Sequence, residues 1–143
     1  MMNEQYRETI LDHFEQPRHR GELAAPTRAM TVTNPACGDL ITVQLRTDPQ
    51  RERIVALAWQ GHGCTLSQAA ASLVAEQCHG QRIETARHMD ATMLADAFGE
   101  AAINARPRCA TLALRALHAA LSDDVLDNES MARKGDLEER RLQ

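Results

Sequence analysis

The chain has 143 residues, the usual size of one domain, which is long enough to bury a hydrophobic core. Hydrophobic residues make up 43% of it but aromatic residues only 3%, so we expect a core of aliphatic side chains and alanine. The net charge of -4, without any basic block, argues against a nucleic-acid-binding protein. No apolar run approaches the roughly 20 residues needed to cross a bilayer, so no membrane span is expected.

The N-terminal segment is polar and acidic, and it lacks the basic stretch and apolar run of a secretory signal. The chain has four cysteines, which are expected to be reduced in a protein without such a signal. We therefore expect a cytoplasmic protein whose thiols bind metal or carry out chemistry rather than form disulfides.

The first half of the chain predicts one helix followed by a small sheet. Apolar residues recur every fourth position until Pro17, which predicts a helix over residues 3–15. Alternating apolar and polar residues then predict three strands, at about residues 30–33, 41–46 and 53–60. The turn Asp48-Pro49-Gln50 makes them an antiparallel meander. One face of the third strand is expected to carry Val55, Leu57 and Trp59.

The second half of the chain predicts helices. From Cys64 to Cys78 the apolar residues follow helical spacing, and Gly80 ends the pattern. Another helix is expected to begin near Asp90, with the apolar residues Met93, Leu94, Ala97, Phe98 and Ala101. The last helix is expected over residues 107–121, because proline suits a first helical turn. Residues 1–122 are thus expected to form a single domain, and residues 123–143 a charged C-terminal tail.

Three of the cysteines are candidate metal ligands. Cys37 and Asp39 lie two residues apart in a polar loop, directly before a strand. Cys64 lies among glycines at a strand-to-helix junction, and Cys109 lies at a helix start, where unpaired amides and the helix dipole favour a thiolate. Ligands at the ends of different elements can converge on one metal ion.

Each candidate also has a structural interpretation. Cys78 falls on the apolar face of its helix, so we expect a buried core residue rather than a ligand. Cys109 also has the spacing of its apolar face, and periodicity alone leaves a core position and a ligand role open. Asp39 follows a glycine, where aspartate often caps a turn. Of the six histidines, His62 is the one beside a candidate ligand, and exposure is the default for most of them.

Four groups of residues occur in order between residues 4 and 121. They are Tyr6-Arg7 with Asp12-His13 and Pro17-Arg18, then Asn34-Pro35-Ala36-Cys37-Gly38-Asp39, then Gly61-His62-Gly63-Cys64, and finally Arg106-Pro107-Arg108-Cys109-Ala110-Thr111-Leu112. Through them the chain resembles the IscU/SufU family, also called NifU N-terminal-like, of iron-sulfur cluster assembly proteins. The resemblance implies an α+β fold, in which a three-stranded antiparallel sheet packs against an N-terminal helix and three to four further helices. It also implies a site formed by Cys37, Asp39, Cys64 and Cys109.

Two branches of this family differ in function. Scaffold-type members have a histidine immediately before the last cysteine, and a Leu-Pro-Pro-Val-Lys segment that a chaperone binds. This chain has Arg108 before its last cysteine and Ala105-Arg106-Pro107 in place of the segment. The run Arg106 to Leu112 resembles the SufU-type branch, whose members bind zinc and accept sulfur from a cysteine desulfurase. The insertion usual in that branch is absent here.

The resemblance implies a role in iron-sulfur cluster assembly. In the favoured interpretation, zinc binds at the four-residue site and Cys37 accepts a persulfide from a cysteine desulfurase of the SufS or IscS type. Cys37 is the expected acceptor because it lies in a glycine-flanked loop, whereas Cys109 is tied to a helix. Iron-sulfur assembly or recipient proteins are the other expected partners, and a zinc-dependent sulfurtransferase activity stays open.

Two alternatives use the same residues. The chain is a scaffold on which a labile [2Fe-2S] cluster is assembled and passed on, or it is a zinc-stabilised interaction module without chemistry. The same donor set accepts zinc and clusters, so ligand type alone does not separate these functions.

Overall fold

The computed structural model describes residues 3–122, and it has the α+β composition expected from the sequence. The elements are α1 (Glu4–Glu15), β1 (Arg28–Asn34), β2 (Asp39–Thr47), β3 (Ile54–His62), α2 (Thr65–Cys78), α3 (Ile83–Arg87), α4 (Ala91–Phe98), α5 (Glu100–Ala105), α6 (Pro107–Ala110) and α7 (Leu112–Ala120). The tail predicted for residues 123–143 lies outside the described residues. Within residues 3–122, no helix is long and apolar enough to span a membrane.

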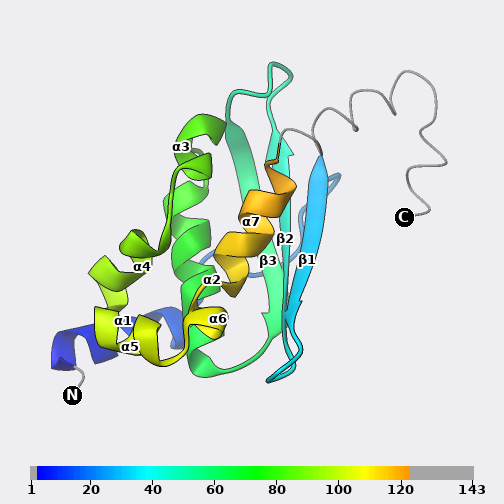
Figure 1. Cartoon of the computed structure of the whole chain (residues 1–143). Helices are drawn as coiled ribbons and strands as arrows, with labels where there is room; N and C mark the ends of the chain where they lie inside the picture. The colour runs from blue at the N-terminus through cyan, green and yellow to red at the C-terminus, as the bar shows by residue number, and fades with distance from the viewer. Residues whose placement is uncertain (1–2, 123–143) are drawn as a thin grey trace.

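The sheet is the predicted antiparallel meander, with its strands in the order β1-β2-β3. Its inner face is fully buried along β2, where the residues are Ile41, Val43 and Leu45. In Figure 1, α2 and α7 lie across one face of the sheet. Because β1 and β2 pair from Arg28↔Leu45 to Asn34↔Asp39, the loop that joins them is short and lies at one end of the sheet.

One position of β3 corrects the prediction. The register of β2 and β3 shifts between Arg46 and Thr47, as in a β-bulge. Val55 is therefore turned outward and is 45% exposed, while Ile54 is buried. Leu57 is buried, as predicted. The prediction for Val55 was wrong because strict alternation holds only in a regular strand.

The helix α2 is the centre of the helical layer. It packs against α1, α7 and β3, and so it is buried on more than one side. Small side chains allow this close packing: Ala69, Ala70, Ala71, Ser72 and Ala75 are all buried. Cys78 is fully buried near its end, and burial raises the pKa of its thiol to about 12. The structure thus confirms Cys78 as a core residue.

Two predicted helices are interrupted. The helix that begins after Asp90 ends at Phe98, because Gly99 has a φ of 90°, so Ala101 belongs to α5 and is exposed. The helix predicted over residues 107–121 is broken at Thr111, whose hydroxyl donates to the carbonyl of Pro107 at 2.8 Å. Cys109 is consequently on the short helix α6, separate from the main apolar face of α7.

His13 is another departure from expectation, because it is buried rather than exposed. Its Nδ1 lies 2.7 Å from the hydroxyl oxygen of Ser72, which joins α1 to α2. The same hydroxyl oxygen accepts a hydrogen bond from the amide of Arg18 at 2.8 Å. Burial and the Arg18 charge lower the pKa of His13.

Candidate metal centre

The four candidate ligands come from three places that meet at one end of the sheet (Figure 1). Cys37 lies in the β1–β2 loop and Asp39 is the first residue of β2. Cys64 is the N-cap residue of α2, directly after β3, and Cys109 lies on α6. Segments far apart in the sequence thus supply the candidate ligands.

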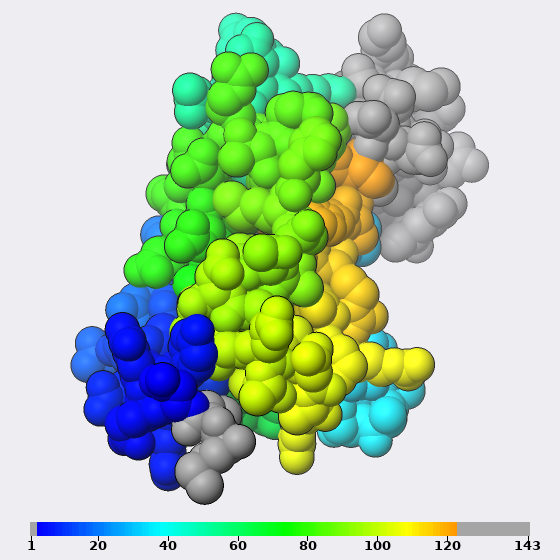
Figure 2. Space-filling model, turned by 60° about the vertical axis from the view of Figure 1, so that its left-hand side comes forward, coloured from blue at the N-terminus to red at the C-terminus, as the bar shows by residue number. Residues whose placement is uncertain are grey.

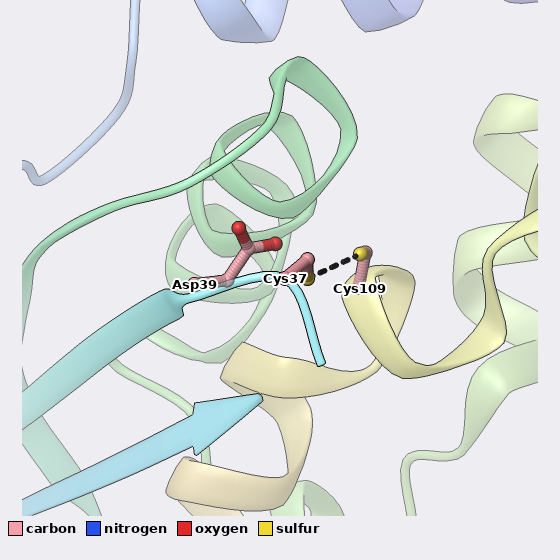
Figure 3. A group of neighbouring side chains, drawn as sticks. All are labelled: Cys37, Asp39 and Cys109. Carbon is pink, nitrogen blue, oxygen red and sulfur yellow. Dashed lines mark hydrogen bonds between the residues drawn. The ribbon is translucent and has the colours of Figure 1, made fainter. Parts of the chain in front are cut away.

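Three of the four form one compact group. The ligand atoms of Cys37, Asp39 and Cys109 all lie within 4.8 Å of one another. The two sulfur atoms are 3.5 Å apart, and Figure 3 shows the two thiols with the carboxylate of Asp39 beside them. Cys37 is exposed, whereas Cys109 and Asp39 are 6% and 3% exposed. The group is therefore reached from outside through Cys37.

Asp39 carries an oxygen atom that is suited to a metal. Its Oδ2 is buried and has no hydrogen-bond partner among the described residues. Burial by itself raises the pKa of this carboxyl, but hydrogen bonds from the thiols of Cys109 and Cys37, and from Ser67, hold the pKa below its ordinary value. Asp39 is thus a carboxylate at neutral pH, with one oxygen atom available as a ligand.

The pKa of Cys109 is shifted in the opposite direction from that of Asp39. Burial, and then contact with Cys37 and Asp39, raises the pKa of its thiol to about 12. A thiol of this kind stays protonated at neutral pH until a metal ion displaces the proton. A metal ion that binds at Cys109 would therefore displace a proton.

Cys64 lies beside the three-residue group and is not part of it. Its sulfur caps α2 by accepting a hydrogen bond from the amide of Ser67 at 3.4 Å. It is close enough to Cys109 to contribute to the raised pKa of that thiol. The role of Cys64 as a fourth ligand stays a prediction.

The side chains of Asp39 and Ser67 lie very close to the backbone of Gly63. At Gly63, a Cβ atom would lie 2.7 Å from Cγ of Asp39 and 2.5 Å from Oγ of Ser67. Those distances are well inside van der Waals contact. Only a residue without a side chain fits here while Asp39 keeps its place.

Two residues in the site were missed by sequence reasoning. Asn34, which is 4% exposed, points its side-chain nitrogen at both Cys37 and Cys109. Ser67 is fully buried between Cys64 and Asp39. The available signals were weak: Asn34 precedes a proline in the candidate loop, and Ser67 stands three residues after a helix N-cap.

His62 and Arg108, which adjoin candidate ligands in the sequence, are both exposed. No hydrogen bond is recorded between either side chain and a candidate ligand in the described part of the chain. Figure 2 shows the loop between β1 and β2 beside α6 at one corner of the molecule, where such exposed groups can meet a partner.

A pocket of about 410 Å³ opens next to Cys64. It lies between α1, the start of α2 and α5, and its walls are mostly apolar, with Ile10, Leu66 and Ala102 among them. Arg106 supplies a charged group at this pocket. The site thus has an apolar approach on one side and the exposed thiol of Cys37 on another.

Comparison with known proteins identifies the family. Residues 5–127 match the family described as NifU-like N terminal domain. The chain belongs to the NifU-like N-terminal domain family. This confirms the resemblance that the four groups of residues indicated.

Relatives of this NifU-like domain include both branches. The iron-sulfur cluster assembly scaffold protein IscU 1 of Archaeoglobus fulgidus is 32% identical over 118 residues, covering 82% of this chain and 75% of the relative. The zinc-dependent sulfurtransferase SufU of Bacillus subtilis is 32% identical over 129 residues, covering 78% of this chain and 86% of the relative.

A solved structure shares the fold of this NifU-like domain. The N-terminal part of a nitrogen-fixing NifU-like protein from Brucella abortus aligns with a TM-score of 0.68 at 22% identity, covering 82% of this chain and 92% of that structure. The arrangement of a three-stranded sheet and packed helices is therefore that of the family.

The donor set of this NifU-like domain fits a zinc ion. Two thiols and a carboxylate already lie together, and a third thiol is adjacent. Zinc in proteins commonly takes four ligands of sulfur, nitrogen or carboxylate oxygen. Within residues 3–122 the buried Oδ2 of Asp39 has no hydrogen-bond partner, and a metal ligand role would explain this observation.

Proposed function

We propose that this chain is an iron-sulfur cluster assembly protein that accepts sulfur on Cys37 from a cysteine desulfurase. In the same proposal it holds zinc through Cys37, Asp39, Cys64 and Cys109. The observation that carries the proposal is the convergence of Cys37, Asp39 and Cys109 within 4.8 Å, with Cys37 exposed on a loop. The relative named as a zinc-dependent sulfurtransferase supports both the metal and the reaction.

In sulfur transfer to Cys37, one sulfur–sulfur bond forms while another breaks. The thiolate of Cys37 attacks the outer sulfur of a persulfide carried by a cysteine of the desulfurase. A bond forms between Cys37 and that sulfur, the bond to the donor cysteine breaks, and the donor leaves as a thiolate. No external oxidant or reductant is needed, because the outer sulfur keeps its oxidation state.

Each residue has a separate part in this process. Cys37 is exposed and belongs to a short loop, so it can reach a partner's persulfide without unfolding of an element. Cys109 is buried on α6, so it holds the site together. Zinc bound there would keep the thiols deprotonated at neutral pH. Asp39 supplies a harder oxygen ligand, which exchanges more readily than sulfur.

Mass spectrometry tests the proposal. Zinc-loaded protein is incubated with a desulfurase and cysteine, and the tryptic peptides are then searched for one added sulfur atom. We expect the added sulfur on Cys37, no transfer in Cys37→Ser, and normal transfer in Cys78→Ser, the matched control in the core. If the added sulfur is absent from Cys37, or if Cys37→Ser still accepts sulfur, the proposal fails. The second outcome would assign sulfur acceptance to another cysteine, whereas no added sulfur on any cysteine would favour a zinc-stabilised interaction module.

A scaffold function is the second candidate, because relatives of similar identity are named as scaffold proteins. In that case a [2Fe-2S] cluster is the cargo, held by the same residues, since thiolates are the usual ligands of such clusters. Anaerobic reconstitution with iron and sulfide would test it. Visible absorption that survives desalting would support the scaffold function, and its loss would exclude a cluster of useful lifetime.

Partners and location follow from the same chemistry. A desulfurase of the SufS or IscS type would be the sulfur donor, and iron-sulfur assembly or recipient proteins would take the product. We place the reaction in the cytoplasm, because the four cysteines of the described residues are all free and such chemistry needs reduced thiols.

A further inference from the structure

We propose that Asn34 is a positioning residue, whose side-chain amide holds the thiol of Cys37 at the site. Asn34 is the last residue of β1, and it is only 4% exposed although its side chain is polar. The inference rests on the proposed function, since it assigns to Asn34 the control of when the sulfur acceptor leaves the site.

The orientation of the Asn34 amide is fixed by its oxygen. Oδ1 accepts a hydrogen bond from the backbone amide of Ala36 at 3.3 Å, which settles which end of the group is nitrogen. Nδ2 then lies 3.1 Å from Sγ of Cys37 and 3.8 Å from Sγ of Cys109. An amide nitrogen carries two hydrogens and only donates, so both sulfurs are acceptors.

The backbone of Asn34 holds the same loop. Its carbonyl oxygen accepts hydrogen bonds from the amides of Cys37 at 3.2 Å and Gly38 at 2.8 Å. One residue therefore fixes both the loop backbone and the thiol at its tip. Because Asn34 also pairs with Asp39 across the two strands, its position is set by the sheet itself.

This geometry gives the amide a specific effect on Cys37. A hydrogen bond to a charged acceptor is stronger than one to a neutral acceptor, so the amide binds a Cys37 thiolate better than a thiol. The amide holds the sulfur of Cys37 beside that of Cys109. This hydrogen bond opposes movement of Cys37 away from the site. Removing the donor should thus let Cys37 swing out more often.

Alkylation of the zinc-loaded protein by iodoacetamide, followed by peptide mass spectrometry, measures this release. Asn34→Leu removes the donor while keeping the branch at Cγ, and Asn34→Asp removes it while keeping an oxygen for Ala36. Asn104→Asp makes the same change at an exposed position of α5 and serves as the control. Cys78, fully buried in the core, reports any general unfolding in the same sample.

We expect Cys37 to react about tenfold faster in both Asn34 variants, which corresponds to about 1.4 kcal/mol. Cys78 should stay unreactive, and Asn104→Asp should match the wild type. If Asn34→Leu does not fold, Asn34→Asp decides alone.

Two results would overturn the inference. One is an unchanged rate at Cys37 in the folded Asn34 variants, and the other is a parallel rise at Cys78 in both variants, which indicates a purely structural role. No desulfurase is present in this experiment, so its failure leaves sulfur acceptance by Cys37 untouched. Conversely, normal release of Cys37 without any sulfur transfer would refute the proposed function alone.

Discussion

Replacement of Gly63 by alanine tests whether Asp39 is held where a metal needs it. The new Cβ would lie 2.7 Å from Cγ of Asp39, whereas carbon atoms in contact are about 3.5 Å apart, so the carboxylate has to recede by about 0.8 Å. It would also lie 2.5 Å from Oγ of Ser67, which blocks retreat of the methyl group in that direction. Disturbing a group that orients a metal ligand typically lowers metal affinity by about 10–100-fold, and we expect a loss of that size.

Gly21 provides a matched control for the backbone. Its φ of 149° is close to the 159° of Gly63, so alanine has a similar conformational cost of about 1–3 kcal/mol at either position. A Cβ at Gly21 meets nothing within 4 Å. The difference between Gly63→Ala and Gly21→Ala therefore isolates the contact with Asp39 and Ser67.

Two measurements on the three proteins are sufficient. Competition with a chromophoric zinc chelator gives the zinc affinity, and urea unfolding of the metal-free protein gives the free energy of unfolding. Gly21→Ala should lose stability and keep the wild-type zinc affinity, while Gly63→Ala should lose both. If Gly63→Ala binds zinc as tightly as Gly21→Ala does, then Asp39 is not a ligand or the packing around it is not tight, and the reasoning is refuted.

Three further predictions concern the ligands and the core. Cys109→Ser and Cys78→Ser should each lose about 1–3 kcal/mol of stability, because both bury a hydroxyl group. Cys109→Ser should bind little zinc, whereas Cys78→Ser should keep its zinc, because only Cys109 lies at the site. Metal analysis and urea unfolding measure the two effects. Asp39→Ala should retain zinc on the three thiols but release it faster to a chelator, and a stopped-flow rate equal to the wild type would contradict a ligand role. The pKa of His13 is lowered on folding, so stability should fall as the pH drops below the ordinary value of 6.5, where the unfolded chain takes up a proton first. His13→Gln should show a shallower fall in unfolding free energy over that range, and an unchanged slope would contradict the assignment to His13.

Residue patterns along the chain were sufficient to predict the three strands and the helices α1 and α2, in the right order. Period-two alternation defined the three strands, and Cys78 was assigned to the core by helical spacing alone, because both patterns depend only on which faces are apolar. The sequence also supplied the three clustered candidate ligands, since Cys37, Asp39 and Cys109 all stand at the ends of elements. Those features are local, and local chemistry is visible in a single chain.

Other features depended on tertiary contacts. Val55 turned outward because of a register shift between two strands, which no pattern within one strand contains. Burial of His13 depended on a hydroxyl from another helix, at Ser72.

The site itself shows the same division. In the sequence, nothing distinguished Asn34 from other polar loop residues. Its role depends on the distance from its amide to the thiol of Cys109, which is 75 residues away in the chain. The close contact of Gly63 with Asp39 likewise exists only because the end of β3 lies beside the start of β2. Residue type and periodicity specify which groups can act, whereas distances between segments remote in sequence decide which of them meet, and those distances are set by packing of the whole domain.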